Sequence, residues 1–218
     1  MDRRMTETQL ASGTLFVVSA PSGTGKTSLV RALLERDPRV QLSISHTTRD
    51  KRPAEQDGDH YYFVDLPTFE SMLVGTEFLE HAQVFGNYYA TSRGAVQQLL
   101  SQGIDVVLEI DWQGARQIRQ HMSGCVGIFI LPPSLQHLRR RLQSRAQDDA
   151  SVIERRMKAA VQEISHYQEY DYLIVNDDFN VASKELSAIV SSQRLRQAPQ
   201  AERLSGLLQA LRTDFEAQ

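Results

Sequence analysis

Four short runs of apolar residues recur along this chain of 218 residues. They cover residues 15–18, 104–110, 125–131 and 172–175. Near-continuous apolar runs of this length are typical of strands that are buried on both faces of a sheet. Each run therefore predicts a core strand.

Amphipathic patterns separate these strands, with apolar residues recurring every three or four positions. The first helix would bury Leu29, Val30, Leu33 and Leu34. Further helices are expected over residues 94–102, 113–122, 134–144 and 151–169. Strands that alternate with helices predict an α/β fold, in which helices cover both faces of a mostly parallel sheet and ligands bind at the carboxyl ends of the strands.

Residues 40–93 break this alternation. Val40, Leu42 and Ile44 alternate with polar residues, residues 61–64 form another short strand candidate, and Gly, Pro, Asp and Tyr are frequent between them. We expect a small, partly antiparallel β-rich lobe here. Its polar and aromatic content suits ligand binding better than a core.

A glycine-rich segment, residues 20–27, joins the first strand to the first helix. Gly23 and Gly25 can adopt backbone angles that are closed to other residues, so successive N–H groups can point at phosphate oxygens. Lys26 would reach the β- and γ-phosphates of a nucleotide, and the Thr27 hydroxyl would ligate Mg²⁺. The flanking strand and helix favour a phosphate-binding loop over a chance polar turn.

The loop departs from the usual pattern G-x-x-x-x-G-K-[ST] at its first position, where Ala20 replaces glycine. A methyl group fits if the backbone there lies in an ordinary region. We therefore expect the alanine to be tolerated.

Composition excludes several classes of protein. With 41% apolar residues and a formal net charge of -3, the chain can bury a substantial core but has no overall attraction to a nucleic acid polymer or an anionic membrane. The single Cys125 is expected to pack as a small hydrophobe, and the six histidines lack metal-ligand spacing. No apolar run approaches the length of a membrane span, so a cytoplasmic location is expected.

A second group of cations and hydroxyls occupies residues 43–53. Arg49 and Arg52 could grip a phosphate through forked donors, and a carboxylate farther along could accept from a purine N–H and amino group. Two phosphate sites in one chain predict transfer of a phosphoryl group between them.

Arginines gather around a polar break at residues 146–150. Leu135, Leu138 and Leu142 would hold one helix face to the body, so that Arg141 and Arg145 project from another. This pattern is typical of a mobile lid. We assign Arg139, Arg140 and Arg155 to a solvated face.

Together these motifs resemble the guanylate kinase family, over roughly residues 13–190. The series S-x-S-x-T-T-R-x-x-R-x-x-E-x-x-G-x-x-Y-x-F, which begins at Ser43, matches at every named position. The resemblance implies a P-loop core (13–39, 94–138, 158–195), a GMP-binding lobe (40–93) and a lid (139–157). An N-terminal extension (1–12), expected to be flexible, and a helical tail (196–218) would flank this domain.

The resemblance also implies Mg²⁺-dependent phosphoryl transfer from ATP to GMP and dGMP. The ATP site would comprise Ala20, Pro21, Ser22, Gly23, Thr24, Gly25, Lys26, Thr27 and Asn176. The GMP site would comprise Ser45, Arg49, Arg52, Tyr61, Glu80, Tyr89, Thr91 and Asp111. The catalytic set would be Lys26, Arg49, Arg141, Arg145 and Arg156, and Glu109 would join the Mg²⁺ shell through water. Relatives often carry glycine where this chain has Ala146 after the lid arginine.

Alternatives stay open at several positions. Glu109 and Asp111 each have a simpler interpretation as caps of the next helix. A ribose bisphosphate kinase could share the loop and lid, and a non-catalytic guanylate-kinase-like module could share the lobe. The set Ser45, Glu80, Tyr89 and Thr91 favours a guanine acceptor, and the presence of Lys26 and the lid arginines argues against a non-catalytic module.

The tail carries apolar residues at helical spacing. Leu204, Leu207, Leu208, Leu211 and Phe215 fall on one face. We expect this face to pack on the body, with a subunit contact in a homo-oligomer as the alternative.

Overall fold

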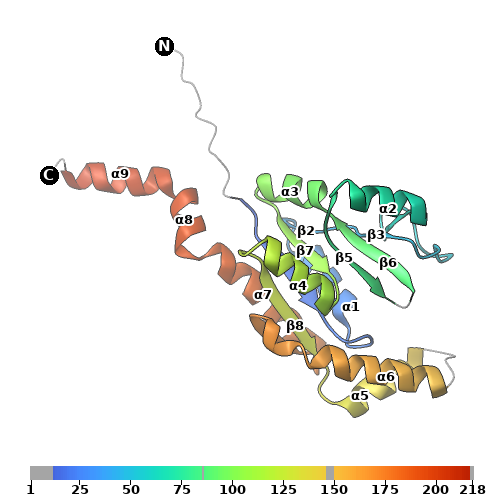
Figure 1. The fold of residues 1–218 in the computed structure, drawn as a ribbon. Helices are drawn as coiled ribbons and strands as arrows, with labels where there is room; N and C mark the ends of the chain where they lie inside the picture. Colours follow the sequence, from blue (N-terminus) through green and yellow to red (C-terminus); the bar gives the residue numbers. More distant parts are fainter. Residues whose placement is uncertain (1–11, 85, 146–149, 217–218) are drawn as a thin grey trace.

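The structure is a computed structural model that describes residues 12–84, 86–145 and 150–216 (Figure 1). A parallel sheet of five strands runs through its core in the order β2-β7-β1-β8-β9. The strands are β1 Leu15–Ser19, β2 Val40–Leu42, β7 Asp105–Glu109, β8 Val126–Leu131 and β9 Tyr172–Val175. The four strands predicted from apolar runs are confirmed.

Helices cover both faces of this sheet, as the alternating pattern predicts. In β1, Phe16 and Val18 face one cluster with helices α1 (Lys26–Arg36) and α7 (Phe179–Arg194). Leu15 and Val17 face the other cluster with α3 (Arg93–Ser101) and α4 (Trp112–His121). Side chains alternate across a strand, so burial on both sides requires the continuous apolar runs seen in the sequence. Cys125 packs, partly buried, against the second cluster.

The prediction that the lobe begins at residue 40 is wrong, because residues 40–42 form a strand of the core sheet. β2 pairs in parallel with β7 at the edge of the core sheet, with Val40 opposite Asp105 and Leu42 opposite Val107. Its alternating pattern arises because an edge strand here has one buried and one exposed face. The lobe begins after it.

The lobe is a second sheet of four strands in the order β4-β3-β6-β5, and it is partly antiparallel as predicted, since β3 and β4 pair in parallel and the other two pairs are antiparallel. Its elements are β3 His46–Thr47, β4 Tyr62–Phe63, α2 Leu66–Val74, β5 Phe78–Val84 and β6 Asn87–Ser92. Phe69 of α2 packs on Phe78 and Ala90 to form a small core. The Gln117 side chain joins the lobe to the body, because it bonds the backbone N–H and C=O of His81 (3.1 and 2.7 Å).

Two helices, α5 (Leu135–Arg145) and α6 (Ala150–Ile164), form the predicted lid region. Leu138 and Leu142 are fully buried against α6, whereas Leu135 is 47% exposed and does not hold the helix to the body. The helix expected to reach residue 169 ends at Ile164 and is followed by a 3-10 turn, Tyr167–Glu169. Residues 146–149 of the predicted polar break and residues 1–11 of the predicted extension lie outside the described residues.

The tail forms α8 (Gln197–Arg203) and α9 (Ser205–Glu216), and α9 extends away from the sheet (Figure 1). Leu207, Leu208 and Leu211 are 44–58% exposed. The expectation that this face packs on the body is therefore wrong. The Phe215 side chain lies outside the described residues. Among the described helices, none is both long and apolar enough to cross a membrane.

Candidate functional site

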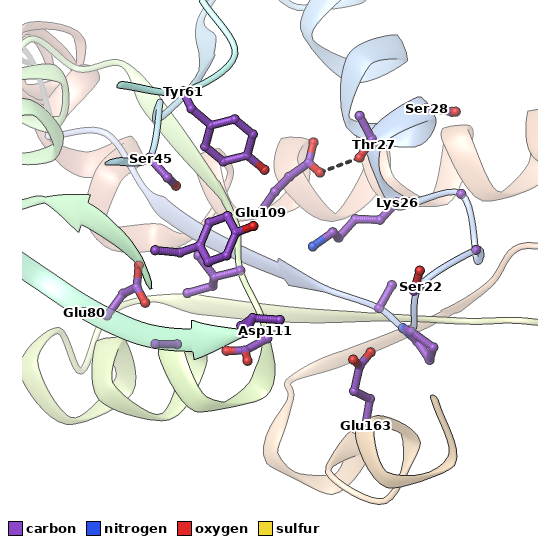
Figure 2. Close-up of a pocket in the computed structure, with 18 residues that line it drawn as sticks. Ser22, Lys26, Thr27, Ser28, Ser45, Tyr61, Glu80, Glu109, Asp111 and Glu163 are labelled. Atoms are coloured by element: carbon purple, nitrogen blue, oxygen red, sulfur yellow. Dashed lines mark hydrogen bonds between the residues drawn. The ribbon is translucent and has the colours of Figure 1, made fainter. Parts of the chain in front are cut away.

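One cavity of about 390 Å³ lies at the carboxyl ends of β1 and β7, where the parallel topology predicts a ligand (Figure 2). The phosphate loop closes one side of it. The lobe supplies Ser45, Tyr61, Glu80 and Tyr89 on the other side. The phosphate loop and part of the predicted GMP site therefore open into the same cavity, whereas Arg49 and Arg52 are not among the residues that line it.

The backbone of the loop takes the unusual angles that its glycines allow. Gly23 has a φ of 92° and Gly25 a φ of 98°, in the left-handed region that disfavours side chains. Thr76 is the one described non-glycine residue with a positive φ, so Ala20 lies in an ordinary region. This geometry explains why alanine is tolerated at the first loop position.

Hydrogen bonds from distant segments fix the loop. The Thr24 carbonyl accepts from Asn176 Nδ2 (2.7 Å) and from Arg141 Nη1 (3.0 Å). Asn176 is buried, and a Cβ added at Gly25 would lie 2.5 Å from its Nδ2 atom. Asn176 and Arg141 thus touch the loop backbone directly in this structure.

Lys26 and Thr27 begin α1, and the Lys26 side chain projects into the cavity (Figure 2). The Thr27 hydroxyl donates to Glu109 Oε2 over 2.8 Å. A hydroxyl and a carboxylate beside a phosphate loop fit Mg²⁺, which binds through one or two protein oxygens together with substrate phosphates. Among the described residues, no group of three or more His, Cys, Asp or Glu side chains could hold a metal ion by itself.

Glu80 forms the polar floor of the lobe side. Only 3% of it is exposed, and its Oε1 atom accepts from the Thr91 hydroxyl over 2.6 Å. Burial raises the pKa of Glu80 to about 7, the Thr91 hydrogen bond opposes this shift, and the charge of Asp111 adds to it. The remaining lone pairs of Glu80 can accept from a ligand placed in the cavity.

Asp111 combines the two interpretations that the sequence left open. Its Oδ1 atom caps α4 by accepting from the N–H groups of Gln113 (3.1 Å) and Gly114 (3.0 Å). It also lines the cavity. Glu109 has no capping bond and instead accepts from Thr27.

Neighbouring residues of the lobe fix the position of the Arg49 side chain. Its guanidinium donates to Glu55 (2.7 Å) and to the Asp50 carbonyl (2.8 Å), and lies 5.4 Å from the centre of the Tyr61 ring. Arg52 lies close in sequence and is exposed. Sequence reasoning named Glu55 only as part of a motif, although it positions Arg49.

Two lid arginines contact the phosphate loop from the lid helices. Arg156 donates to the Ser22 hydroxyl over 2.8 Å, and Arg141 contacts the loop as described above. The Arg145 side chain lies outside the described residues. Arg139 pairs with Glu154 across the lid helices, Arg140 and Arg155 are exposed, and none of the three lines the cavity.

One cavity residue was missed from the sequence. Glu163 of α6 lines the cavity beside the phosphate loop, opposite Asp111 (Figure 2). A single glutamate on an amphipathic helix gives no signal of this position, because only the tertiary fold brings α6 to the loop.

A parallel sheet with this glycine-rich loop at the end of β1 defines a P-loop nucleotide-binding protein. The family model for guanylate kinase matches residues 12–193. A guanylate kinase of Alkalilimnicola ehrlichii is 61% identical over 184 residues, which cover 84% of this chain and 91% of that protein. The guanylate kinase of Escherichia coli K12 is 55% identical over 207 residues, covering 94% and 100%.

A crystal structure of guanylate kinase from Anaplasma phagocytophilum superposes with a TM-score of 0.73 at 36% identity, covering 86% of this chain and 89% of that one. This chain belongs to the guanylate kinase family.

Proposed function

We propose that this chain transfers the γ-phosphate of ATP to GMP, and to dGMP, in a Mg²⁺-dependent reaction that yields ADP and GDP. One observation carries the proposal most directly. Lys26 of the phosphate loop and the buried Glu80 of the lobe line the same cavity, so a donor and an acceptor nucleotide would meet there.

The acceptor would bind on the lobe. Arg49, Arg52, Tyr61 and Tyr89 suit its phosphate, because guanidinium forks and phenolic hydroxyls donate to phosphate oxygens. The carboxylate of Glu80 would accept from the paired donors of guanine, flanked by Ser45, Thr91 and Asp111. In this arrangement the arginines would face the charged phosphate, and the buried carboxylate would accept hydrogen bonds from the base.

The donor would bind on the phosphate loop. Backbone N–H groups and Lys26 face its phosphates, Asn176 and Arg141 hold the loop in shape, and Arg156 approaches from the lid. Mg²⁺ bound with the nucleotide would neutralise phosphate charge beside Thr27 and Glu109. The lid arginines, Arg145 included, would add positive charge on closing.

The GMP phosphate is already ionised enough to attack the γ-phosphorus, so the reaction requires no general base. The protein contributes alignment of the two phosphates and stabilisation of charge on the group in transfer. Closure of lid and lobe would exclude water, which would otherwise hydrolyse ATP.

Substitution of Lys26 tests the donor half. In Lys26→Ala we expect kcat to fall by about a thousandfold or more, since the lost ammonium would stabilise charge mainly in the transition state. GMP binding, measured by calorimetry without ATP, should stay nearly unchanged. Lys184→Ala, an exposed lysine on α7, is the matched control. A Lys26 variant with wild-type kcat would contradict the proposal.

A further inference from the structure

Glu163 is the cavity residue that neither the phosphate loop nor the lobe explains. It lies in the last turn of α6, half-buried, and its carboxylate points toward the part of the loop that carries Ser22 (Figure 2). Among the described residues, no hydrogen bond or ion pair involves this carboxylate. An ionised carboxylate at this place would repel the phosphates of a donor nucleotide, so its charge bears on their binding.

The placement of Glu163 follows from the periodicity of α6. Arg156, Ala160 and Glu163 are spaced by four and three residues and therefore share one helix face. Ala160 is buried against α5, and Arg156 donates to Ser22 of the loop. The same face thus presents a cation and an acid to the phosphate loop, two helical turns apart.

The charges around Glu163 are those of the donor site. Burial raises the pKa of Glu163 to about 7, the ammonium of Lys26 opposes this shift, and the charge of Asp111 adds to it. Further titratable or charged groups face the same cavity or lie on the same element: Glu80 from β5, Glu109 from β7, Tyr61 and Tyr89 from the lobe, and Arg156 and Lys158 on α6. Lys26 is the one described cation that lines the cavity with Glu163.

We propose that Glu163 is a positioning residue for the donor phosphates: its carboxylate balances the charge of Lys26 while the loop is empty, and it takes up a proton from solvent when the triphosphate becomes the counter-ion of Lys26. The neutral acid no longer repels the phosphates, and its O–H group becomes a donor toward the loop. The inference rests on the proposed donor site.

Proton uptake follows from linkage. Phosphate binding removes the attraction of Lys26 for the Glu163 carboxylate and adds negative charge, so both changes favour the protonated acid. Because the free group is largely ionised above pH 7, MgATP binding at pH 7.5 should take up about half a proton or more. Affinity for MgATP should consequently fall by up to about tenfold per pH unit between pH 7.5 and 8.5.

Calorimetry of MgATP binding without GMP, in buffers of different ionisation enthalpy, measures this uptake. In Glu163→Gln, which resembles the protonated acid, we expect uptake to drop by the contribution of Glu163 and affinity to become nearly independent of pH from 7 to 8.5. Titration of the nucleotide itself is common to both proteins and cancels in the comparison. Glu185→Gln, an exposed glutamate on α7, should behave as wild type.

Equal proton uptake by wild type and Glu163→Gln, with both proteins binding MgATP, would overturn the role of Glu163 and leave the proposed function standing. Absence of MgATP binding to the wild-type chain would overturn both. A fold defect in Glu163→Gln would appear as a lowered unfolding temperature, and Glu163→Asp, which keeps the acid, should then restore pH-dependent uptake.

Discussion

Glu80 is subject to two opposing demands. Its burial favours the neutral acid, whereas the guanine of the proposed acceptor would present N–H donors that an ionised carboxylate accepts best. A raised pKa near 7 places the change between these forms within the working range of pH. For the free chain the sign is opposite: the protonated acid stabilises the fold, and this contribution is lost as the pH rises from the ordinary value of 4.5 through about 7.

GMP affinity should therefore improve as Glu80 ionises. We expect the KM for GMP to fall as the pH rises from 6 to 8. In Glu80→Gln the KM for GMP should depend on pH only as far as GMP itself titrates. At pH 8 the substitution should raise the KM for GMP by about tenfold to a hundredfold, since a charged acceptor contributes about 1.5–3 kcal/mol, and leave the KM for MgATP nearly unchanged. Equal weakening of both nucleotides would show that Glu80 acts structurally.

For single residues, the sequence predicted which residues belong to the site better than it predicted what they contact. Lys26, Thr27 and Glu109 meet as the motif and the strand end predict, because parallel strands bring their carboxyl ends together. Asn176 and Arg141 contact the loop backbone, a detail that depends on the packing of β9 and α5 near the loop. Glu163 was missed for the same reason.

Among the elements, the four core strands with apolar runs were predictable, whereas in the lobe the sequence identified β4, within residues 61–64, but not β5 and β6. An apolar run such as Val126–Leu131 identifies a doubly buried strand from its own residues. β5 and β6 carry polar and aromatic residues that serve the site, so their pattern is weak and their pairing with each other decides the structure. β2 was misassigned because a short edge strand can join either sheet.

Arg194 ties three elements together at the far end of the sheet. From α7 it donates to Asp105 at the start of β7 (2.6 Å) and to Asp37 after α1 (2.5 Å). Burial favours the neutral form of Asp37, but the bonds from Arg194 and from the Arg39 amide outweigh it and hold the pKa of Asp37 below its ordinary value. This contribution to stability is present at neutral pH and is lost as the pH falls through that lowered pKa.

Loss of this cation should destabilise the fold, because it removes the cationic partner of the buried Asp105 and leaves Asp37 with Arg39 alone. In Arg194→Met we expect the free energy of unfolding, from urea titration at pH 7, to fall by about 3–5 kcal/mol. The deficit relative to wild type should narrow below about pH 4, where Asp37 starts to be protonated. Lys184→Met, exposed on the same helix, should change little. A deficit that stays constant down to pH 2 would show that packing, and not charge, is lost.

For the whole molecule, side-chain hydrogen bonds join the lobe to the body and the lid to the phosphate loop. Gln117 of α4, the helix that begins directly after Asp111, donates a hydrogen bond to the His81 carbonyl of the lobe. Arg156 of the lid donates one to the Ser22 hydroxyl of the phosphate loop. By contrast, α9 carries exposed leucines far from this cavity, and the wrong expectation for the tail shows that an apolar helix face does not specify what covers it.

A coupled assay that measures the release of ADP, with MgATP and one acceptor nucleotide or sugar phosphate at a time, tests transfer to a guanine nucleotide most directly. The acceptors are GMP, dGMP, AMP, UMP, CMP and a ribose bisphosphate. We predict rapid release with GMP and dGMP and little with the others, because in the proposed site Glu80 would accept hydrogen bonds from guanine donors that the other substrates do not present in the same arrangement. Absence of release with GMP, together with release with another acceptor, would contradict the proposed function.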